Sequence, residues 1–402
     1  MTDRIIDPSS PSRGPRDDPA WVAVVSLALG VFGLVTAEFL PVSLLTPISE
    51  DLGVSTGIAG QTITATAVIG AVAGPGVVIG TRNLDRRWVL LSLTTLLIVS
   101  SALAAMAASL PVLLLARVLL GIGLGGFWAM SAALAMRLVP EQLMPRAMAI
   151  VFTGVSVATV CAAPLGAWIG ATLGWRVAFA LSAGVGVLAL FVQVATVPSL
   201  PPNGSASLAT MAGLLRRSRV RIGLLVTVII IAGHFAGFTY IRPYLEQIPR
   251  LGVEVISLAL LAYGIAGFFG NLLGGALAGR STTLGIATGA GLIALAALLM
   301  LWGGALPLVS WAAIALWGLA FGILPVSLQT HVTRAASDEA ESVGAMLLTS
   351  FQVAISSGAV LGGLLVDTQG PLGVVTFSGL ACALGAIVIL ARGGRQAQLQ
   401  GN

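Results

Sequence analysis

Long apolar segments recur along the whole of this 402-residue chain. A helix needs about 20 apolar residues to cross a bilayer, and twelve segments come close to that length or exceed it. Only 9% of the residues are charged, against about 25% in soluble domains, which excludes an ordinary soluble protein. We therefore predict an all-α integral membrane protein with twelve transmembrane helices in a lipid bilayer. They are expected at approximately 21–45, 57–79, 89–108, 110–135, 146–170, 177–196, 221–245, 254–279, 283–303, 307–331, 342–365 and 371–391.

One interval between the apolar segments is much longer than the others. Residues 197–220 contain three prolines and end in a cluster of arginines, a composition typical of a linker. This linker divides the chain into a first half of six helices at 21–196 and a second half of six helices at 221–391. Polar tails are expected at 1–20 and 392–402.

The arginines predict how the helices are oriented. All 20 basic residues are arginine, and cytoplasmic segments of membrane proteins are enriched in Lys and Arg. If the N-terminus is cytoplasmic, 16 arginines fall in cytoplasmic segments and 3 in outside segments, with Arg117 left within the membrane. Both termini are therefore predicted to be cytoplasmic. The arginines form no basic face on a soluble domain, so nucleic acid is not an expected partner.

Similar residues recur in the two halves at a nearly constant distance along the chain. Gly121 and Gly125 match Gly318 and Gly322 at an offset of 197 residues. Further matches join Arg137 to Arg334, Gly166 to Gly362, Gly174 to Gly370, and the Leu-Gly-Val run at 52–54 to that at 251–253. Two pseudo-symmetric six-helix halves are typical of secondary transporters, which rock around a site near the membrane midplane. The repeat thus favours a transporter with alternating access over a channel or an enzyme.

Two charged residues lie most clearly inside the apolar segments. Glu38 and Arg117 each cost about 2.5–3.5 kcal/mol at a helix centre, so each should face a partner or a wet cavity. Neither has a charged counterpart in the second half, where the matching positions are Tyr240 and Ile314. We hypothesise that Glu38 takes up and releases a proton under the influence of Arg117. The alternative is that both side chains extend from helix ends to the membrane surface.

Aromatic and amide side chains within the segments are candidates for binding a substrate. Aromatic planes and amides together suit a flat heteroaromatic ring, because rings stack while amides bond the ring edges. The alternative for each residue is packing or contact with lipid, and His234 is either a titratable group or a hydrogen-bonded packing residue. The candidates are Gln61, Phe127, Trp128, His234, Phe238, Tyr240, Asn271 and Gln352.

Metal and cofactor sites are not predicted. Cys161 and Cys382 both lie in apolar segments, where small buried residues are expected. Neither His234 nor His331 has a second His, Cys or carboxylate at ligand spacing. The chain also lacks a nucleotide-binding Walker motif, so ATP hydrolysis within this chain is not its energy source. We expect no metal, no cofactor and no enzymatic activity.

Three motifs together resemble those of the major facilitator superfamily, in its drug:proton antiporter branch. They are the Arg-centred run at 117–126, the run at 163–166 followed by Gly170, and the loop at 80–90 with Asp85, Arg86 and Arg87. The resemblance implies a twelve-helix antiporter in which Arg117 takes part in proton coupling. It also implies a gating role for Asp85, Arg86 and Arg87, although this loop is shorter than the family's and lacks its second glycine.

Within that family, the runs at 38–47, 125–132 and 238–243 resemble those of bacterial purine ribonucleoside exporters. This resemblance implies efflux of inosine- or guanosine-like nucleosides, in exchange for protons, across the bacterial inner membrane. We expect a monomer. The alternatives are a proton-driven multidrug or sugar efflux pump of the same fold and, from a different class, a membrane receptor that transports nothing.

Overall fold

The computed structural model describes residues 20–140, 143–201 and 213–400, and this part of the chain is helical without any strand. Its helices are α1 Trp21–Leu52, α2 Thr56–Gly80, α3 Arg86–Ala105, α4 Leu110–Leu138, α5 Met144–Thr172, α6 Trp175–Thr196, α8 Ser218–Thr239, α9 Ile241–Gln247, α10 Val253–Arg280, α11 Thr282–Gly303, α12 Pro307–Ala335 and α13 Ala340–Gln400. Eleven of the described helices are long and apolar enough to cross a membrane.

The last helix, α13, accounts for two of the twelve predicted spans. Its backbone is not helical at Gly370, where φ is +73°, a conformation that side chains disfavour. Pro371 follows and has no N–H to continue the preceding helix. The two parts of α13 correspond to the spans expected at 342–365 and 371–391, which confirms the twelve-span fold. The helix also continues to Gln400, nine residues beyond the predicted end of the last span.

Two other predicted helix ends were wrong. The single span expected at 221–245 is broken at Tyr240, between α8 and α9. The reason is that Pro243 has no N–H to donate to the carbonyl of Thr239, so the helix cannot continue unchanged. The first helix was expected to end at residue 45, but α1 runs to Leu52 with prolines inside it. The tail at 1–19 and the central part of the linker, 202–212, lie outside the described residues, so the linker bounds stay a prediction.

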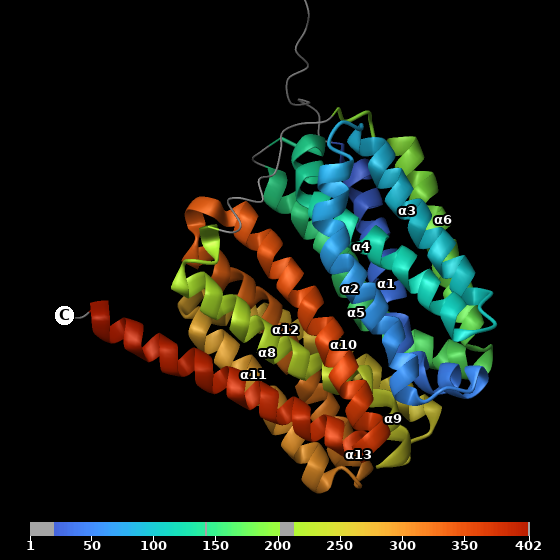
Figure 1. Ribbon diagram of the computed structural model, residues 1–402, viewed down its shortest axis with the longest axis vertical. Coiled ribbons are helices and arrows are strands. Elements are labelled where there is room, and N and C mark those ends of the chain that lie inside the picture. The colour runs from blue at the N-terminus through green and yellow to red at the C-terminus, as the bar shows by residue number, and fades with distance from the viewer. Residues whose placement is uncertain (1–19, 141–142, 202–212, 401–402) are drawn as a thin grey trace, which may run out of the picture.

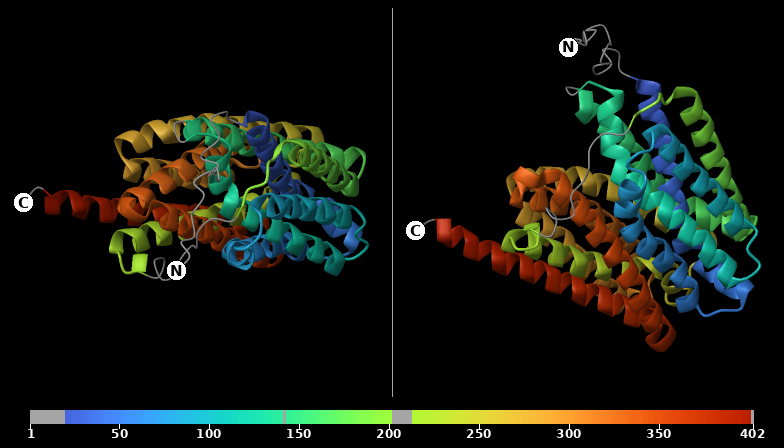
Figure 2. Two further views of the ribbon diagram at one scale, coloured as in Figure 1. Left: turned by 90° about the horizontal axis from the view of Figure 1, so that it is seen from above. Right: turned by 45° about the horizontal axis from the view of Figure 1, so that its top comes forward.

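The helices pack as two groups, α1–α6 and α8–α13 (Figure 1). We call the end of the molecule where α6 ends at Thr196 and α8 begins at Ser218 the linker end, and the opposite end the far end. The two groups meet at the far end and diverge toward the linker end (Figures 1 and 2). The group α1–α6 has a buried apolar core of its own, and a second core lies mainly in α8–α13.

The repeated glycines make equivalent contacts in the two groups. A side chain at Gly121 on α4 would collide with the backbone of Thr66 on α2. A side chain at Gly318 on α12 would likewise collide with the backbone of Tyr263 on α10. The second and fourth helices of each group thus approach closely through matching glycines, as small residues allow between membrane helices. This equivalence agrees with the predicted pseudo-symmetry.

Candidate functional site between the helix groups

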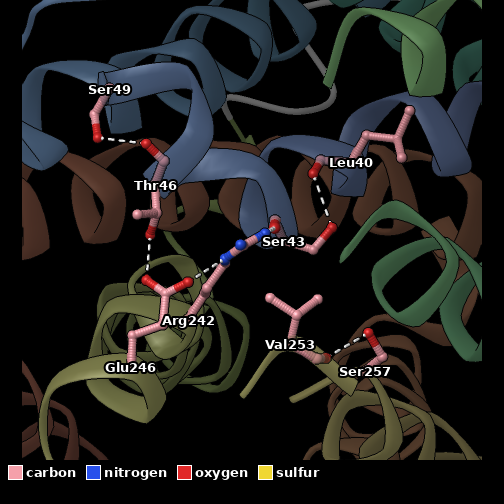
Figure 3. Close-up of polar contacts among 8 residues, drawn as sticks. All are labelled: Leu40, Ser43, Thr46, Ser49, Arg242, Glu246, Val253 and Ser257. Atoms are coloured by element: carbon pink, nitrogen blue, oxygen red, sulfur yellow. Dashed lines mark hydrogen bonds and ion pairs between the residues drawn. The ribbon is translucent and has the colours of Figure 1, made fainter. Parts of the chain in front are cut away.

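Most polar contacts between the two groups lie at the far end. All four hydrogen bonds that join the groups, among the described residues, lie there. Two of them connect α1 with α9: Arg242 Nη1 donates to the carbonyl oxygen of Ser43, and Thr46 Oγ1 donates to Glu246 Oε2 at 2.6 Å (Figure 3). Arg242 and Glu246 also form an ion pair within α9, with 2.7 Å between Nε and Oε1.

The other two hydrogen bonds connect α2 with α13. Asp367 on α13 accepts from Ser55 Oγ at 2.5 Å and from the backbone N–H of Gly57 at 2.9 Å. Ser55 is the N-cap of α2, so the carboxylate lies at the positive end of that helix, where a negative charge is favoured. We call Ser43, Thr46, Ser55, Gly57, Arg242, Glu246 and Asp367 the far-end latch.

Arg117 is buried deep in the first group with incomplete hydrogen bonding. Its side chain is 0% exposed, so it does not extend to the membrane surface. Nη2 donates to the carbonyl oxygen of Ala37 at 2.7 Å, and Nε donates to Thr66 Oγ1 at 3.2 Å. The ring of Phe179 lies 5.6 Å from the guanidinium carbon. Nη1 has no partner among the described residues, and a buried donor left in this way costs about 1–3 kcal/mol. Arg117 therefore keeps one donor free beside α1.

Glu38 lies next to the residue that Arg117 binds. It faces Arg117 within the first group and Gln352 on α13 across the interface. The Glu38 carboxylate and the Arg117 guanidinium are nevertheless more than 4 Å apart, since this pair is not among the three ion pairs of the described residues. Gln352 also has an unpartnered buried atom, Oε1. An acid, a cation and an amide thus lie close together between the groups. The cation, Arg117, and the amide, Gln352, each have one polar atom without a hydrogen-bond partner among the described residues.

A cluster of aromatic rings lies beside this charged region. Phe39, the neighbour of Glu38, stacks at 6.3 Å on Phe235 of α8. His234 lies between two rings, 3.8 Å from Phe321 and 5.4 Å from Phe238. We call Phe39, His234, Phe235, Phe238, Tyr263, Trp317 and Phe321 the aromatic cluster. It combines flat apolar surfaces with buried polar atoms, a surrounding that suits a flat ring.

Comparison with known proteins identifies the fold family. Residues 27–359 match the profile of the Major Facilitator Superfamily. This chain belongs to the major facilitator superfamily. It is 40% identical over 374 residues to the purine ribonucleoside efflux pump NepI of Escherichia coli O6:H1, covering 93% of this chain and 94% of the relative. It is 41% identical over 375 residues to the pump of the same name from Salmonella enteritidis PT4, with the same coverage of both chains.

A solved structure supports the superfamily fold. The human organic anion transporter MFSD10 (TETRAN) superposes with a TM-score of 0.65 and covers 94% of this chain and 100% of its own. At 17% identity, that likeness concerns the fold alone. Membership makes the chain a multi-pass membrane transporter, not an enzyme.

The structure brings only part of the predicted substrate set together in this superfamily member. His234 and Phe238 lie in the aromatic cluster, and Gln352 faces Glu38. Phe127 is fully buried and packs against Gly30 of α1, while Trp128 lies 5.9 Å from Phe152 of α5. These contacts of Phe127 and Trp128 lie within the first group, and the substrate role of both residues stays a prediction.

The remaining candidates lie away from Glu38 and Arg117. Tyr240 is buried at the far end, where its hydroxyl donates to the carbonyl of Ala359 at 2.9 Å. Gln61 donates to the carbonyl of Gly57 within its own helix at 3.4 Å. Asn271 is exposed, two turns after Gly264, where α10 packs against α5. Asn271 therefore lies on the side of α10 that the divergence of the groups uncovers, and its substrate role stays a prediction.

The sequence-based reading missed Tyr263, Trp317, Phe321 and Asp367. Tyr263 and Trp317 are buried, and both belong to the aromatic cluster. The offset of 197 residues would have shown that Gly318, the neighbour of Trp317, is a helix-contact position, but it says nothing about which rings meet. No group of three or more His, Cys, Asp and Glu that could hold a metal ion occurs among the residues with described positions.

The predicted gating loop packs onto its own half of the superfamily fold. Asp85 accepts from the backbone N–H groups of Arg87 and Leu200, each at 2.8 Å, and from the hydroxyl of Ser199. Burial alone would raise the pKa of the Asp85 carboxyl, but these hydrogen bonds and the charge of Arg137 outweigh it and lower that pKa below its usual value. The loop is thereby tied to the residues that follow α6.

The two arginines of the loop also form hydrogen bonds within the first group. Arg87 Nη2 donates to the carbonyl of Val194 near the end of α6 at 2.8 Å. Arg86 Nη1 donates to Thr81 Oγ1 at 3.0 Å. None of the loop's hydrogen bonds among described residues reaches the second group, so in this conformation the loop does not close the linker end.

Replacing Asp85 with Asn should loosen this loop and lower the free energy of unfolding by about 1 kcal/mol at pH 7. Because folding lowers the pKa of Asp85, its contribution is present above the unfolded-state pKa of about 4 and is lost as the pH falls through the folded-state value. Thermal unfolding of the full chain in detergent should show a difference between D85N and wild type that shrinks as the pH falls from about 5 to about 2.

The control is Asp338→Asn, which removes an exposed ion pair with Arg217 and should change little. A difference between D85N and wild type that stays constant over this pH range would contradict the assignment.

Proposed function

We propose that this chain exports purine ribonucleosides, inosine- or guanosine-like, from the cytoplasm across the bacterial inner membrane in exchange for protons. Glu38 carries the proton, and Arg117 controls its charge state. The relatives of 40–41% identity, which carry the name purine ribonucleoside efflux pump, cover nearly the whole chain and support this substrate class. The observation that carries the mechanism is the partly buried Glu38, which faces the fully buried Arg117.

Alternating access follows from the arrangement of the two groups. The arginine distribution supports a linker end in the cytoplasm and a far end outside. With the far-end latch closed and the groups diverging at the linker end, this conformation admits a substrate from the cytoplasm. Rocking the groups would break the latch, bring the linker ends together and expose Glu38 to the outside, where it takes up a proton as the nucleoside leaves.

Arg117 couples the charge of Glu38 to the conformation of the two helix groups. Its bond to the carbonyl of Ala37 fixes the guanidinium beside α1, and its free Nη1 favours an ionised Glu38 nearby. A protonated Glu38 loses that attraction. Return of the groups to the conformation with a closed latch then delivers the proton to the cytoplasm, and the proton gradient supplies the free energy for export.

Uptake of labelled inosine into inverted membrane vesicles tests this function. With an acidic lumen, vesicles that contain the wild-type chain should accumulate inosine above its outside concentration, and a proton uncoupler should remove the accumulation. Vesicles lacking the chain are the control. Accumulation that does not respond to the uncoupler would contradict proton exchange.

Competition distinguishes the nearest alternatives. Unlabelled inosine should compete strongly, whereas lipophilic cations and sugars at the same concentration should not. Strong competition by a lipophilic cation or a sugar would instead favour a multidrug or sugar efflux pump of the same fold. Absence of any flux would favour a receptor.

A further inference from the structure

His234 is held in one tautomer by its neighbour Trp317. The indole Nε1–H of Trp317 donates to His234 Nδ1 at 2.9 Å. An indole nitrogen is only ever a donor, so Nδ1 must accept through its lone pair, and the ring proton resides on Nε2. Adding a second proton at Nδ1 would set two N–H groups against each other. While this bond persists, His234 is therefore a neutral ring with one N–H donor.

That donor is buried and free. His234 is 0% exposed, and its Nε2 has no partner among the described residues. The rings of Phe321 and Phe238 lie nearly parallel to the imidazole, at 6° and 16°, and fix its plane. Nearby, the Tyr263 hydroxyl is also buried without a described partner, and the Tyr263 ring stacks on Phe238 at 4.7 Å. The aromatic cluster thus holds an oriented polar atom that its own packing does not use.

We propose that His234 recognises the purine base of the substrate as a fixed neutral donor, and that Trp317 is the positioning residue that keeps it in this form. This inference rests on the proposed function. Phe321 stacks on the imidazole and is itself partly exposed, so the aromatic cluster borders accessible space. His234 is then a specificity-determining residue and takes no part in carrying the proton, which is left to Glu38.

The chemistry of the base determines what such a donor selects. A 6-oxopurine presents two adjacent acceptors, O6 and N7, whereas a 6-aminopurine replaces the O6 acceptor with an N–H₂ donor. A neutral imidazole N–H directed at position 6 bonds the first and is opposed by the second. The site should therefore favour inosine over adenosine and over purine riboside, which has hydrogen at position 6.

The test measures KM and maximal rate for inosine and purine riboside in inverted vesicles. In the wild type, KM should be about ten-fold lower for inosine, the effect of one hydrogen bond. In His234→Phe, which keeps a ring but has no donor, the two KM values should become equal. In His234→Gln, which keeps an N–H but cannot carry a proton in this pH range, the preference and the dependence on the pH gradient should both remain.

Trp317→Phe tests the positioning role. Without the indole N–H, His234 is free to change tautomer, so KM for inosine should rise several-fold and the preference over purine riboside should shrink, with the maximal rate little changed. The matched control is His331→Gln, because His331 bonds Thr282 at 2.9 Å outside the aromatic cluster. This variant should behave as the wild type. Each preference is a ratio within one variant and does not depend on the amount of folded protein.

Two results would overturn the inference while leaving nucleoside export intact. One is an undiminished preference for inosine in His234→Phe, and the other is loss of the pH-gradient dependence in His234→Gln. Wild-type vesicles that transport neither nucleoside would overturn the proposed function itself and this inference with it.

Discussion

Replacing Glu38 with Gln is expected to abolish proton-driven accumulation of nucleoside. The amide has nearly the same shape as the carboxyl but cannot carry a proton, so the pH gradient no longer does work on the cycle. Inosine in E38Q vesicles should reach only its outside concentration, whatever the lumenal pH. Binding should persist, because the aromatic cluster and Gln352 are unchanged. Exchange of labelled for unlabelled inosine, which needs no net proton movement, measures this retained function.

Glu254 provides the matched control for Glu38. It also lies on a membrane helix, α10, but its side chain is exposed at the start of that helix. E254Q should therefore accumulate inosine at close to the wild-type level. Full gradient-driven accumulation in E38Q would show that another group carries the proton. Loss of both accumulation and exchange would assign Glu38 to binding as well.

Replacing Asp367 with Ala is expected to shift the protein toward the conformation that is open at the far end. The change removes two of the four hydrogen bonds between the groups, together with the negative charge at the start of α2. Hydrogen bonds contribute about 0.5–1.5 kcal/mol each, so the loss is about 1–3 kcal/mol. The population ratio of the two conformations should change by about 5- to 150-fold.

Labelling of a single introduced cysteine measures this shift. Ala67 on α2 is buried against the second group, so a cysteine there is protected while the latch is closed. In D367A, an Ala67→Cys reporter should react with an impermeant maleimide added outside at least several-fold faster. Asp338→Ala is the control, since the Asp338–Arg217 ion pair lies within the second group at the linker end. Equal labelling rates in D367A and the control would contradict a latch at this position.

Hydropathy was sufficient for the fold because each span must satisfy its backbone within one helix. Local backbone chemistry explains the errors. Pro243 interrupts a continuous apolar run that hydropathy treats as one span, and α1 stays helical beyond residue 45 despite Pro47. Glu38 and Arg117 were found for a related reason. Charges inside spans are costly enough to be rare, so each is conspicuous in the sequence.

The aromatic part of the site could not be found in the same way. Trp302 and Trp317 lie in similar apolar runs, yet Trp302 is 87% exposed and Trp317 is 1% exposed. Lipid and protein interior are both apolar, so the sequence does not distinguish a ring that faces lipid from one that binds His234. Phe127 is a related case, since its burial against Gly30 depends on how α1 and α4 cross. Only the tertiary arrangement separates these cases.

The small size of the far-end latch has a consequence for how the membrane voltage acts on this protein. Four hydrogen bonds at about 0.5–1.5 kcal/mol each amount to about 2–6 kcal/mol. One elementary charge that crosses 100 mV gains about 2.3 kcal/mol, which is the same order. A much stronger set of contacts would hold one conformation at any physiological voltage. With polar contacts of this strength, the membrane voltage is large enough to shift how often the far end opens.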